Sequence, residues 1–461
     1  MHITEHDINL QPDYSHGLCT IRIGVFFDGT GLNGNALKDE YLETFTCSNV
    51  YRLFQYYQSN INATKGQLSL KVYVEGIGTR DNMPDSIYSM FTGGEDIWGK
   101  YGYGPDSKLN MCSARIADQL DKLLTVNDVN QKTVNIELDL FGFSRGAVLA
   151  RHVANLIYEK NALITDRLRT TCGAHGAHFN EKPVVNFLGL FDTVGSFMSM
   201  SVIFDNPHET GTTGNLKVYV PQGAVRNAFQ LNALHECRYN FALYSFSGLY
   251  PEMTLAGAHS DIGGGYPEIM DEVKDLTTYK TIGFLKRAKT RVDEELDIVR
   301  KSKTFHILTR HIRYRGWEDA WCIATSKRHV KGHLQFIAFL AMLNIAQKCG
   351  CVFESGYEKY EVLLPENLHG YKDQVLLNAQ KACIGQAADI DKAIIDNVTD
   401  EYVHLSASWR TIFERYHDLT GKTELVSGHQ YADKQTSLDF SVLKNFWPDR
   451  PEENWKRKIF K

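Results

Sequence analysis

Five short apolar runs in the N-terminal part of the chain each end on a glycine or a polar residue. They are residues 21–27 (IRIGVFF), 68–74 (LSLKVYV), 134–141 (VNIELDLF), 184–191 (VVNFLGLF) and 253–258 (MTLAGA). Runs of this length, bounded by turn residues, are typical of buried strands. Segments with helical periodicity lie between them, at residues 49–58, 113–125 and 147–160. This alternation predicts an α/β fold with a doubly wound, mostly parallel sheet.

The pattern changes after about residue 280. Helical segments that are either charged or strongly apolar follow, at residues 281–302, 332–349 and 373–395. We therefore expect an α/β domain in residues 1–285 and a mainly helical region in residues 286–461. Glycine- and aromatic-rich residues 93–104 (GGEDIWGKYGYG) are interpreted either as a flap over the site or as an ordinary surface loop.

Composition excludes several classes of protein. Hydrophobic residues make up 43% and charged residues 23% of the chain, with only 11 prolines, which is a globular composition rather than a disordered, collagen-like or coiled-coil one. Fifty basic and 55 acidic side chains give a net charge of −5. No long run of Lys or Arg occurs, so nucleic acid is not an expected partner.

The cysteines and the N-terminal residues indicate where the chain is made. None of the nine cysteines forms a C-x-x-C pair, which favours synthesis in a reducing compartment. The opening residues have neither a basic nor an apolar signal region, so we expect synthesis in the cytoplasm without a signal peptide. The longest apolar run, residues 336–346 (FIAFLAMLNIA), is about half the ~20 residues of a transmembrane helix. No transmembrane segment is predicted.

Residues 142–146 (GFSRG) form a G-x-S-x-G sequence directly after an apolar run and directly before helix-forming residues. This context predicts a nucleophile elbow, in which a serine lies on a tight turn between a strand and a helix. Glycine is needed on both sides because larger side chains would clash there. Ser144 is therefore the candidate nucleophile. The alternative is a capping serine in a glycine-lined turn.

A catalytic serine needs a histidine base and a carboxylate that orients the histidine. In α/β hydrolases the chain order is serine, acid, histidine. Asp192 directly follows the run at 184–191, and His259 directly follows the run at 253–258. Both are thus expected at the carboxyl ends of strands, where Ser144 also emerges. A capping role for Asp192 and a loop position for His259 are the alternatives.

Five further residues are candidates for supporting roles. Asp261 is the second-choice acid, although a local capping role suits it better, and His404 is the second-choice base. The backbone N–H of Arg145 is the expected first donor to an oxyanion, and Gly29 or Thr30, in the loop after the first strand, is expected to supply the second. That loop lacks both the Walker lysine and the G-x-G-x-x-G spacing, which disfavours nucleotide binding.

Five ordered blocks, from about residue 21 to residue 267, together resemble the DUF2235 family, the catalytic domain of one class of type VI secretion lipase effectors. They are IRIGVFFDGTGLN, YVEGIGT, LFGFSRGAVLARHVANLI, FLGLFDTVGS and AGAHSDIGGGYP, and EYVHLSASW is similar to a block near the end of that domain. The resemblance implies an α/β-hydrolase-like lipase whose triad is Ser144, Asp192 and His259.

The resemblance also implies a biological setting. Such effectors act on membrane phospholipids in the periplasm of a target bacterium, usually reach it on a VgrG spike, and are usually countered in the producer by a periplasmic immunity protein. We expect a phospholipase of type A1 or A2 that needs no cofactor and no metal. An esterase acting on soluble substrates and a non-catalytic interaction protein remain alternatives. Residues 336–346 and the tail 454–461 (NWKRKIFK) are either lipid-contacting segments or a core helix and a solvated tail.

Overall fold

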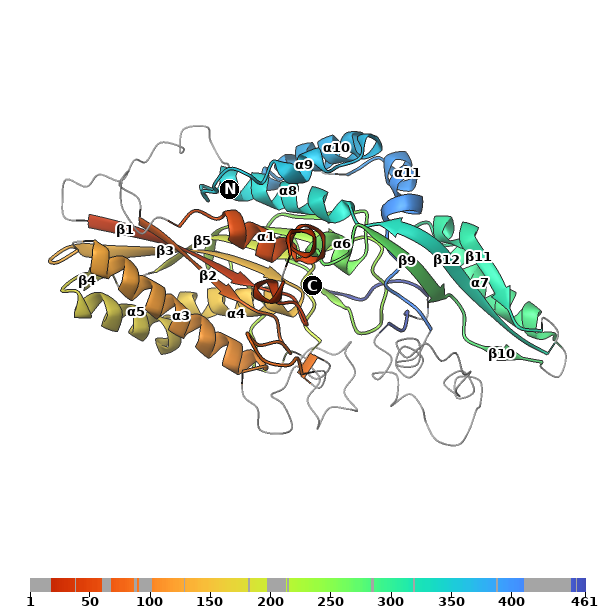
Figure 1. Ribbon diagram of the computed structural model, residues 1–461, viewed down its shortest axis with the longest axis horizontal. Helices are drawn as coiled ribbons and strands as arrows, with labels where there is room; N and C mark the ends of the chain where they lie inside the picture. The colour runs from red at the N-terminus through yellow and green to blue at the C-terminus, as the bar shows by residue number, and fades with distance from the viewer. Residues whose placement is uncertain are drawn as a thin grey trace.

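The main sheet of the protein is parallel and lies between helices, with a second sheet extending to one side (Figure 1). A computed structural model describes residues 18–37, 39–59, 68–86, 89–90, 102–127, 129–180, 183–196, 213, 215–282, 286–317, 320–386, 389–409, 449–452 and 454–461. The sheet has seven strands, in the order β2 (Leu68–Val74), β1 (Leu18–Phe27), β3 (Thr133–Phe143), β5 (Val184–Phe191), β6 (Val225–Ala233) and β8 (Glu252–Leu255), with β4 (His178–Phe179) also paired with β3. All its pairings are parallel. The predicted α/β fold class is confirmed.

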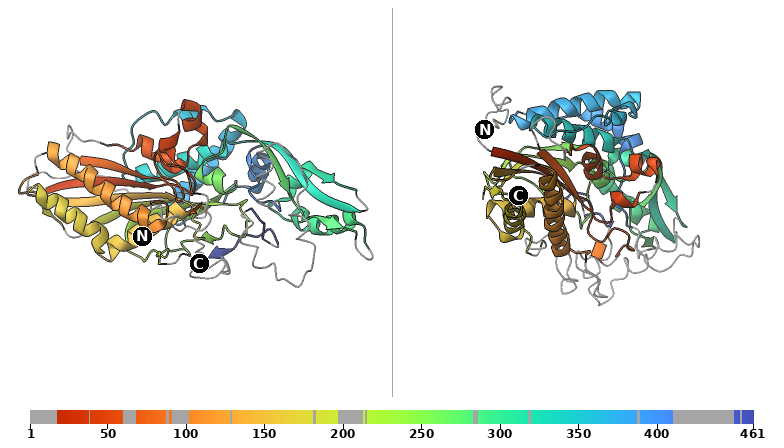
Figure 2. Two further views of the ribbon diagram at one scale, coloured as in Figure 1. Left: turned by 60° about the horizontal axis from the view of Figure 1, so that its bottom comes forward. Right: turned by 60° about the vertical axis from the view of Figure 1, so that its left-hand side comes forward.

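Helices cover both faces of this sheet (Figures 1 and 2). On one face lie α3 (Pro105–Val126), α4 (Arg145–Tyr158) and α5 (Ala162–Ala174). On the other lie α1 (Asn49–Tyr56), α8 (Leu334–Lys348), α9 (Lys359–Val362) and α10 (Glu366–Cys383). Short 3-10 and π segments are η2 (Gly34–Ala36), η3 (Leu42–Thr46) and η5 (His306–His311).

The apolar helix α8 is a core helix. Its residues from Phe336 to Leu343 are at most 8% exposed, and they pack with sheet residues such as Phe141 and Phe187 in one hydrophobic cluster. This cluster contains residues from both sides of residue 285. Of the two interpretations of residues 336–346, the structure therefore shows the buried one. Within the described residues, no helix is long and apolar enough to span a bilayer.

A second, antiparallel sheet forms an arm beside the main sheet (Figure 1). It consists of β9 (Ile269–Asp275), β10 (Lys280–Thr281), β11 (Ile312–Arg315) and β12 (Trp321–Lys331), flanked by α7 (Ala288–Arg300) and α11 (Lys392–Tyr402). In the described residues after 285, helices occupy more residues than strands, but the sequence analysis missed β11 and β12. Strand β11 has no buried residue and contains two arginines. In β12 the buried residues Cys322–Ser326 include Thr325 and Ser326 and are followed by charged residues, so neither strand shows a long apolar run.

Three loops of the main sheet define the place where a site is expected. Ser144 follows β3, Asp192 follows β5, and the loop that begins at Asp28 follows β1. Because β1, β3 and β5 are neighbours and run parallel, these residues emerge at one edge of the sheet. Most of the segment interpreted as a flap, residues 93–101, lies outside the described residues.

Candidate active site

Ser144 lies on a sharp turn between β3 and α4. Its backbone has φ 57° and ψ −125°, and a positive φ of this kind costs a non-glycine residue about 1–3 kcal/mol. Helix α4 also begins so close to the end of β1 that a Cβ at Gly146 would lie 2.4 Å from the carbonyl oxygens of Phe27 and Asp28. A Cβ at Gly142 would lie 2.6 Å from the backbone of α4. Strand, strained serine and helix together have the geometry of a nucleophile elbow.

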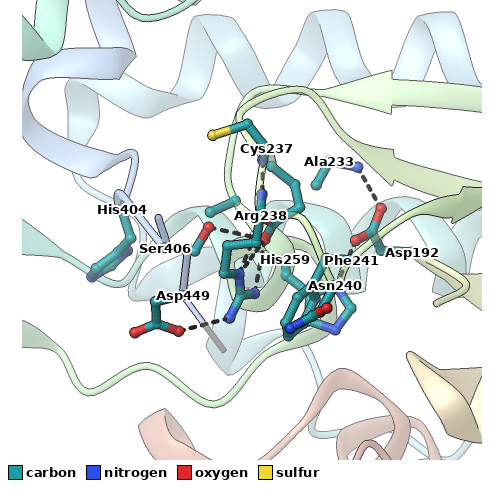
Figure 3. A network of polar contacts seen from close by, with 12 residues as sticks. Asp192, Ala233, Cys237, Arg238, Asn240, Phe241, His259, His404, Ser406 and Asp449 are labelled. Atoms are coloured by element: carbon teal, nitrogen blue, oxygen red, sulfur yellow. Dashed lines mark hydrogen bonds and ion pairs between the residues drawn. The ribbon is translucent and has the colours of Figure 1, made fainter. Parts of the chain in front are cut away.

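Asp192 and His259, both labelled in Figure 3, form a hydrogen-bonded pair. Asp192 directly follows β5, and His259 begins the short helix α6 (His259–Gly263). Nδ1 of His259 lies 2.5 Å from Oδ2 of Asp192. An ionised carboxylate only accepts hydrogen bonds, so Nδ1 carries the proton and Nε2 of the neutral ring is the basic nitrogen. The backbone N–H of Ser144 donates to the carbonyl of Phe191 at 3.1 Å, which joins the elbow to the strand that carries the acid.

Asp192 is fully buried and its carboxylate is saturated with donors. Oδ1 accepts the backbone N–H of Ala233 at 2.9 Å. The guanidinium of Arg457 donates to Oδ1 at 2.6 Å and to Oδ2 at 2.8 Å. Burial opposes ionisation of Asp192, but the positive charge of Arg457 and the hydrogen bond from His259 outweigh it and hold the pKa of Asp192 below its usual 3.8. The acid is therefore an anion at neutral pH.

His259 is enclosed by two aromatic rings. The ring of Phe143 lies 4.6 Å from the imidazole, and the ring of Phe241 lies 5.0 Å from it at a steep angle. His259 is 5% exposed. Burial lowers its pKa below the usual 6.5, although Asp192 acts in the opposite direction. Because Phe143 directly precedes Ser144, the histidine packs against the same turn that carries the serine.

Two groups that could stabilise an oxyanion lie next to the elbow. Helix α4 begins at Arg145, so its first amides and its dipole are at the Ser144 turn. The buried Arg145 side chain donates from Nε to Oγ1 of Thr30 at 2.6 Å and so ties the loop after β1 to the elbow. The N–H of Gly29 donates to Oδ1 of Asp28 at 2.7 Å and is already engaged. Among the described residues, the N–H of Thr30 has no acceptor, which makes it the better second donor.

The sequence matches the family model of the catalytic domain of Tle1-like phospholipase effectors of the type VI secretion system, over residues 22–174 and 158–282. These matches cover more than half of the chain. The chain belongs to this family.

One solved structure supports the fold of this Tle1-like chain, and a second matches it only weakly. The Tle1 effector bound to the VgrG spike of the type VI secretion system matches with a TM-score of 0.72 and 23% identity, covering 96% of this chain and 94% of that chain. An uncharacterized protein from Pseudomonas aeruginosa matches with a TM-score of 0.46 and 16% identity, over 94% of this chain and 64% of that chain. No curated protein matches.

The two second-choice residues of the Tle1-like chain contact each other. Nδ1 of His404 lies 2.7 Å from Oδ1 of Asp261, and both side chains are fully buried. Oδ2 of Asp261 accepts the backbone N–H groups of Ala258 at 2.8 Å and of His404 at 3.0 Å. The pair thus fixes the start of α6, the helix that begins with His259. This geometry supports a role in holding the base in place.

Arg457 is a site residue that the sequence analysis missed. It lies 265 positions after Asp192, in the basic tail that was interpreted as either lipid-contacting or solvated. Its neighbours Lys456 and Lys458 are exposed, whereas the Arg457 side chain is 6% exposed. Nothing in the local sequence distinguishes it from the lysines on either side.

Loss of the hydrogen bond between Arg145 and Thr30 is expected to impair catalysis. Thr30→Val removes the acceptor with little change in shape, and we expect kcat on a soluble ester to fall about 10–100-fold with KM nearly unchanged, because a displaced oxyanion donor acts on the transition state. Steady-state kinetics measure this, with Arg145→Met as the partner variant. Additive losses in the double variant would contradict a shared role, since residues that act as a unit give non-additive effects.

Proposed function

We propose that this Tle1-like chain is a serine phospholipase of the A type that hydrolyses membrane phospholipid esters through a triad of Ser144, Asp192 and His259. The observation that carries the proposal is the buried Asp192–His259 pair, whose imidazole packs against Phe143, the residue directly before the strained Ser144 at the carboxyl edge of the sheet. Family membership supports a lipid substrate, since the family model describes phospholipase effectors.

In the proposed reaction, Nε2 of His259 takes the proton of the Ser144 hydroxyl while Oγ attacks the ester carbonyl. Asp192 holds the ring tautomer and stabilises the imidazolium that forms. The N–H groups of Arg145 and Thr30 stabilise the oxyanion. The imidazolium then protonates the leaving lysophospholipid oxygen, and water, activated by the same histidine, releases the fatty acid from Ser144.

We further propose delivery by the type VI secretion machine into the periplasm of a target cell. A solved relative, the Tle1 effector, is bound to a VgrG spike, and this chain matches it along nearly its whole length. A VgrG protein is therefore the proposed carrier, and an immunity protein in the producer's periplasm is the proposed antagonist. Retention of the purified chain by an immobilised VgrG from the same bacterium tests the carrier.

The substrate is tested with vesicles of phospholipids that carry different acyl chains at the two glycerol positions. We expect the wild-type protein to release one fatty acid and the matching lysophospholipid, and mass spectrometry then assigns A1 or A2 specificity. Ser144→Ala serves as the matched blank. Hydrolysis of a soluble ester without any hydrolysis of vesicles would favour the esterase alternative.

The pH dependence of the reaction follows from the lowered pKa of His259. The base must be neutral, so activity is lost as pH falls through its pKa, which lies below 6.5. We expect kcat/KM to stay level from neutral pH down to below 6.5 and then to fall about tenfold per pH unit. A fall of kcat/KM with its midpoint above pH 6.5 would contradict a buried His259 whose pKa is lowered.

A further inference from the structure

The described residues of segment 449–461, which are 449–452 and 454–461, dock beside the active site instead of leaving the molecule as a tail. It runs along residues 237–245, where the N–H of Tyr239 donates to the carbonyl of Arg450 at 2.8 Å and the N–H of Leu243 donates to the carbonyl of Lys458 at 2.9 Å. Its last strand, β13 (Ile459–Phe460), pairs in parallel with β7 (Leu243–Tyr244). Trp455 is 4% exposed and belongs to a hydrophobic cluster. The segment is thus anchored on both sides of Arg457.

Arg457 uses all three of its guanidinium nitrogens at the site. Two of them form the bidentate contact with the Asp192 carboxylate, at 2.6 Å and 2.8 Å. The third, Nε, donates to the backbone carbonyl of Phe241 at 2.7 Å. The ring of Phe241 in turn packs against His259. The Arg457 side chain therefore contacts both Asp192 and Phe241, the residue whose ring packs against His259.

We propose that Arg457 is a positioning residue of the catalytic site, and that docking of segment 449–461 completes the triad. Its guanidinium fixes the Asp192 carboxylate in the orientation that aligns His259, and it offsets the charge of that carboxylate. The proposal rests on the proposed function, because it assigns Arg457 a part in the same site.

The charges around His259 show why Arg457 matters for the base. Without the guanidinium, the fully buried Asp192 carboxylate would keep, among the described residues, only the neutral ring of His259 and the amide of Ala233 as partners, and its full charge would act on His259. After Asp192, the charged groups with the largest effects on the pKa of His259 are Arg238, which lowers it, and Glu236, which raises it, and these two side chains lie 2.8 Å apart. Arg457 is thus the cation in direct contact with the acid, and it offsets the negative charge that faces the imidazolium.

The test compares Arg457→Gln, Arg457→Lys and the matched control Lys456→Gln, which removes one exposed charge from the same segment. For Arg457→Gln we expect kcat on a soluble ester to fall about 10–100-fold with KM changed little. We also expect the acid limb of its kcat/KM–pH profile to move upward by about 1 pH unit, because an Asp192 carboxylate without the Arg457 charge stabilises the protonated form of His259 more strongly. Arg457→Lys keeps the positive charge but loses the bidentate geometry of the guanidinium. Its kcat should therefore be intermediate, and the acid limb of its pH profile should lie close to that of the wild type. Lys456→Gln should match the wild type in both.

Two results would overturn the proposal. One is an Arg457→Gln variant with the kcat and acid limb of Lys456→Gln. The other is a lower kcat together with a wild-type acid limb in both Arg457 variants, which would mean that the residue only supports the fold.

Histidine titration by NMR on ¹⁵N-labelled protein separates this proposal from the proposed function, because it needs no substrate. His259→Gln assigns the signal. A higher His259 pKa in Arg457→Gln supports the proposal, and an equal pKa overturns it. If the wild-type protein hydrolyses no ester, the proposed function fails, and this titration alone decides the role of Arg457.

Discussion

Replacing Ser144 by alanine is expected to lower kcat for ester hydrolysis by about 10⁴–10⁶-fold while leaving the fold intact. The change removes only the hydroxyl oxygen from a side chain that is 5% exposed, and the backbone keeps its hydrogen bond to Phe191. Initial rates on vesicles and on a soluble ester measure the loss, and thermal unfolding measures the stability. Retained activity in the variant would refute the nucleophile assignment.

Ser144→Gly is the matched control for this experiment. Glycine adopts a φ of 57° without strain, so this variant should be more stable than Ser144→Ala by about 1 kcal/mol while being equally inactive. A protein that is more stable and inactive separates the catalytic role of the hydroxyl from any structural role. Equal stability of the two variants would show that the turn is not strained.

Asp192→Asn is expected to lower kcat by about 10⁴-fold, the loss typical of replacing the acid of such a triad. The amide can donate to Nδ1 of His259 and so favours the wrong tautomer. It also leaves the buried Arg457 without its anion, which should lower the free energy of unfolding by about 3–5 kcal/mol. Steady-state kinetics and denaturant unfolding measure the two effects.

Asp261→Asn provides the control for this prediction, because Asp261 is, within the part of the chain that the structure describes, the second buried carboxylate paired with a histidine. We expect it to be destabilised, since the start of α6 loses an anchor, with a much smaller loss of kcat than Asp192→Asn. The opposite order of the two losses would make Asp261 the catalytic acid.

The lowered pKa of Asp192 also predicts how the free energy of unfolding depends on pH. Because the pKa of Asp192 in the folded protein lies below 3.8, its contribution to stability is present above that pH and is lost as pH falls through the folded-state pKa. The free energy of unfolding of the wild type should therefore fall more steeply below pH 3.8 than that of Asp192→Asn. Parallel slopes would contradict the lowered pKa.

Local signals account for what could be predicted from the sequence. The apolar runs that became β1, β2, β3 and β5 are buried on both faces, so their composition alone identifies them. The elbow is equally local, since its glycines, its serine and the helix formers are adjacent in sequence. Asp192 and His259 each follow an apolar run, which predicted that both lie at the carboxyl ends of strands. The structure brings these two side chains into contact.

The features that the sequence analysis missed depend on partners distant in the chain. Strand β6 carries polar residues at buried positions. Among them is Gln230, which is accommodated because it accepts hydrogen bonds from Arg151 and Thr193. Arg457 depends in the same way on Asp192, and its basic surroundings resemble a solvated tail. The local sequence cannot show that a buried polar residue will find its hydrogen-bond or ion-pair partner elsewhere in the chain, because only folding brings the two together.

The most direct test of the triad is covalent labelling with a fluorophosphonate probe, followed by mass spectrometry of the digested protein. The account predicts a single adduct on Ser144 of the wild-type protein, formed far more slowly in Asp192→Asn and in His259→Gln. An adduct on another residue, or ester hydrolysis that continues while Ser144 stays unmodified, would contradict it.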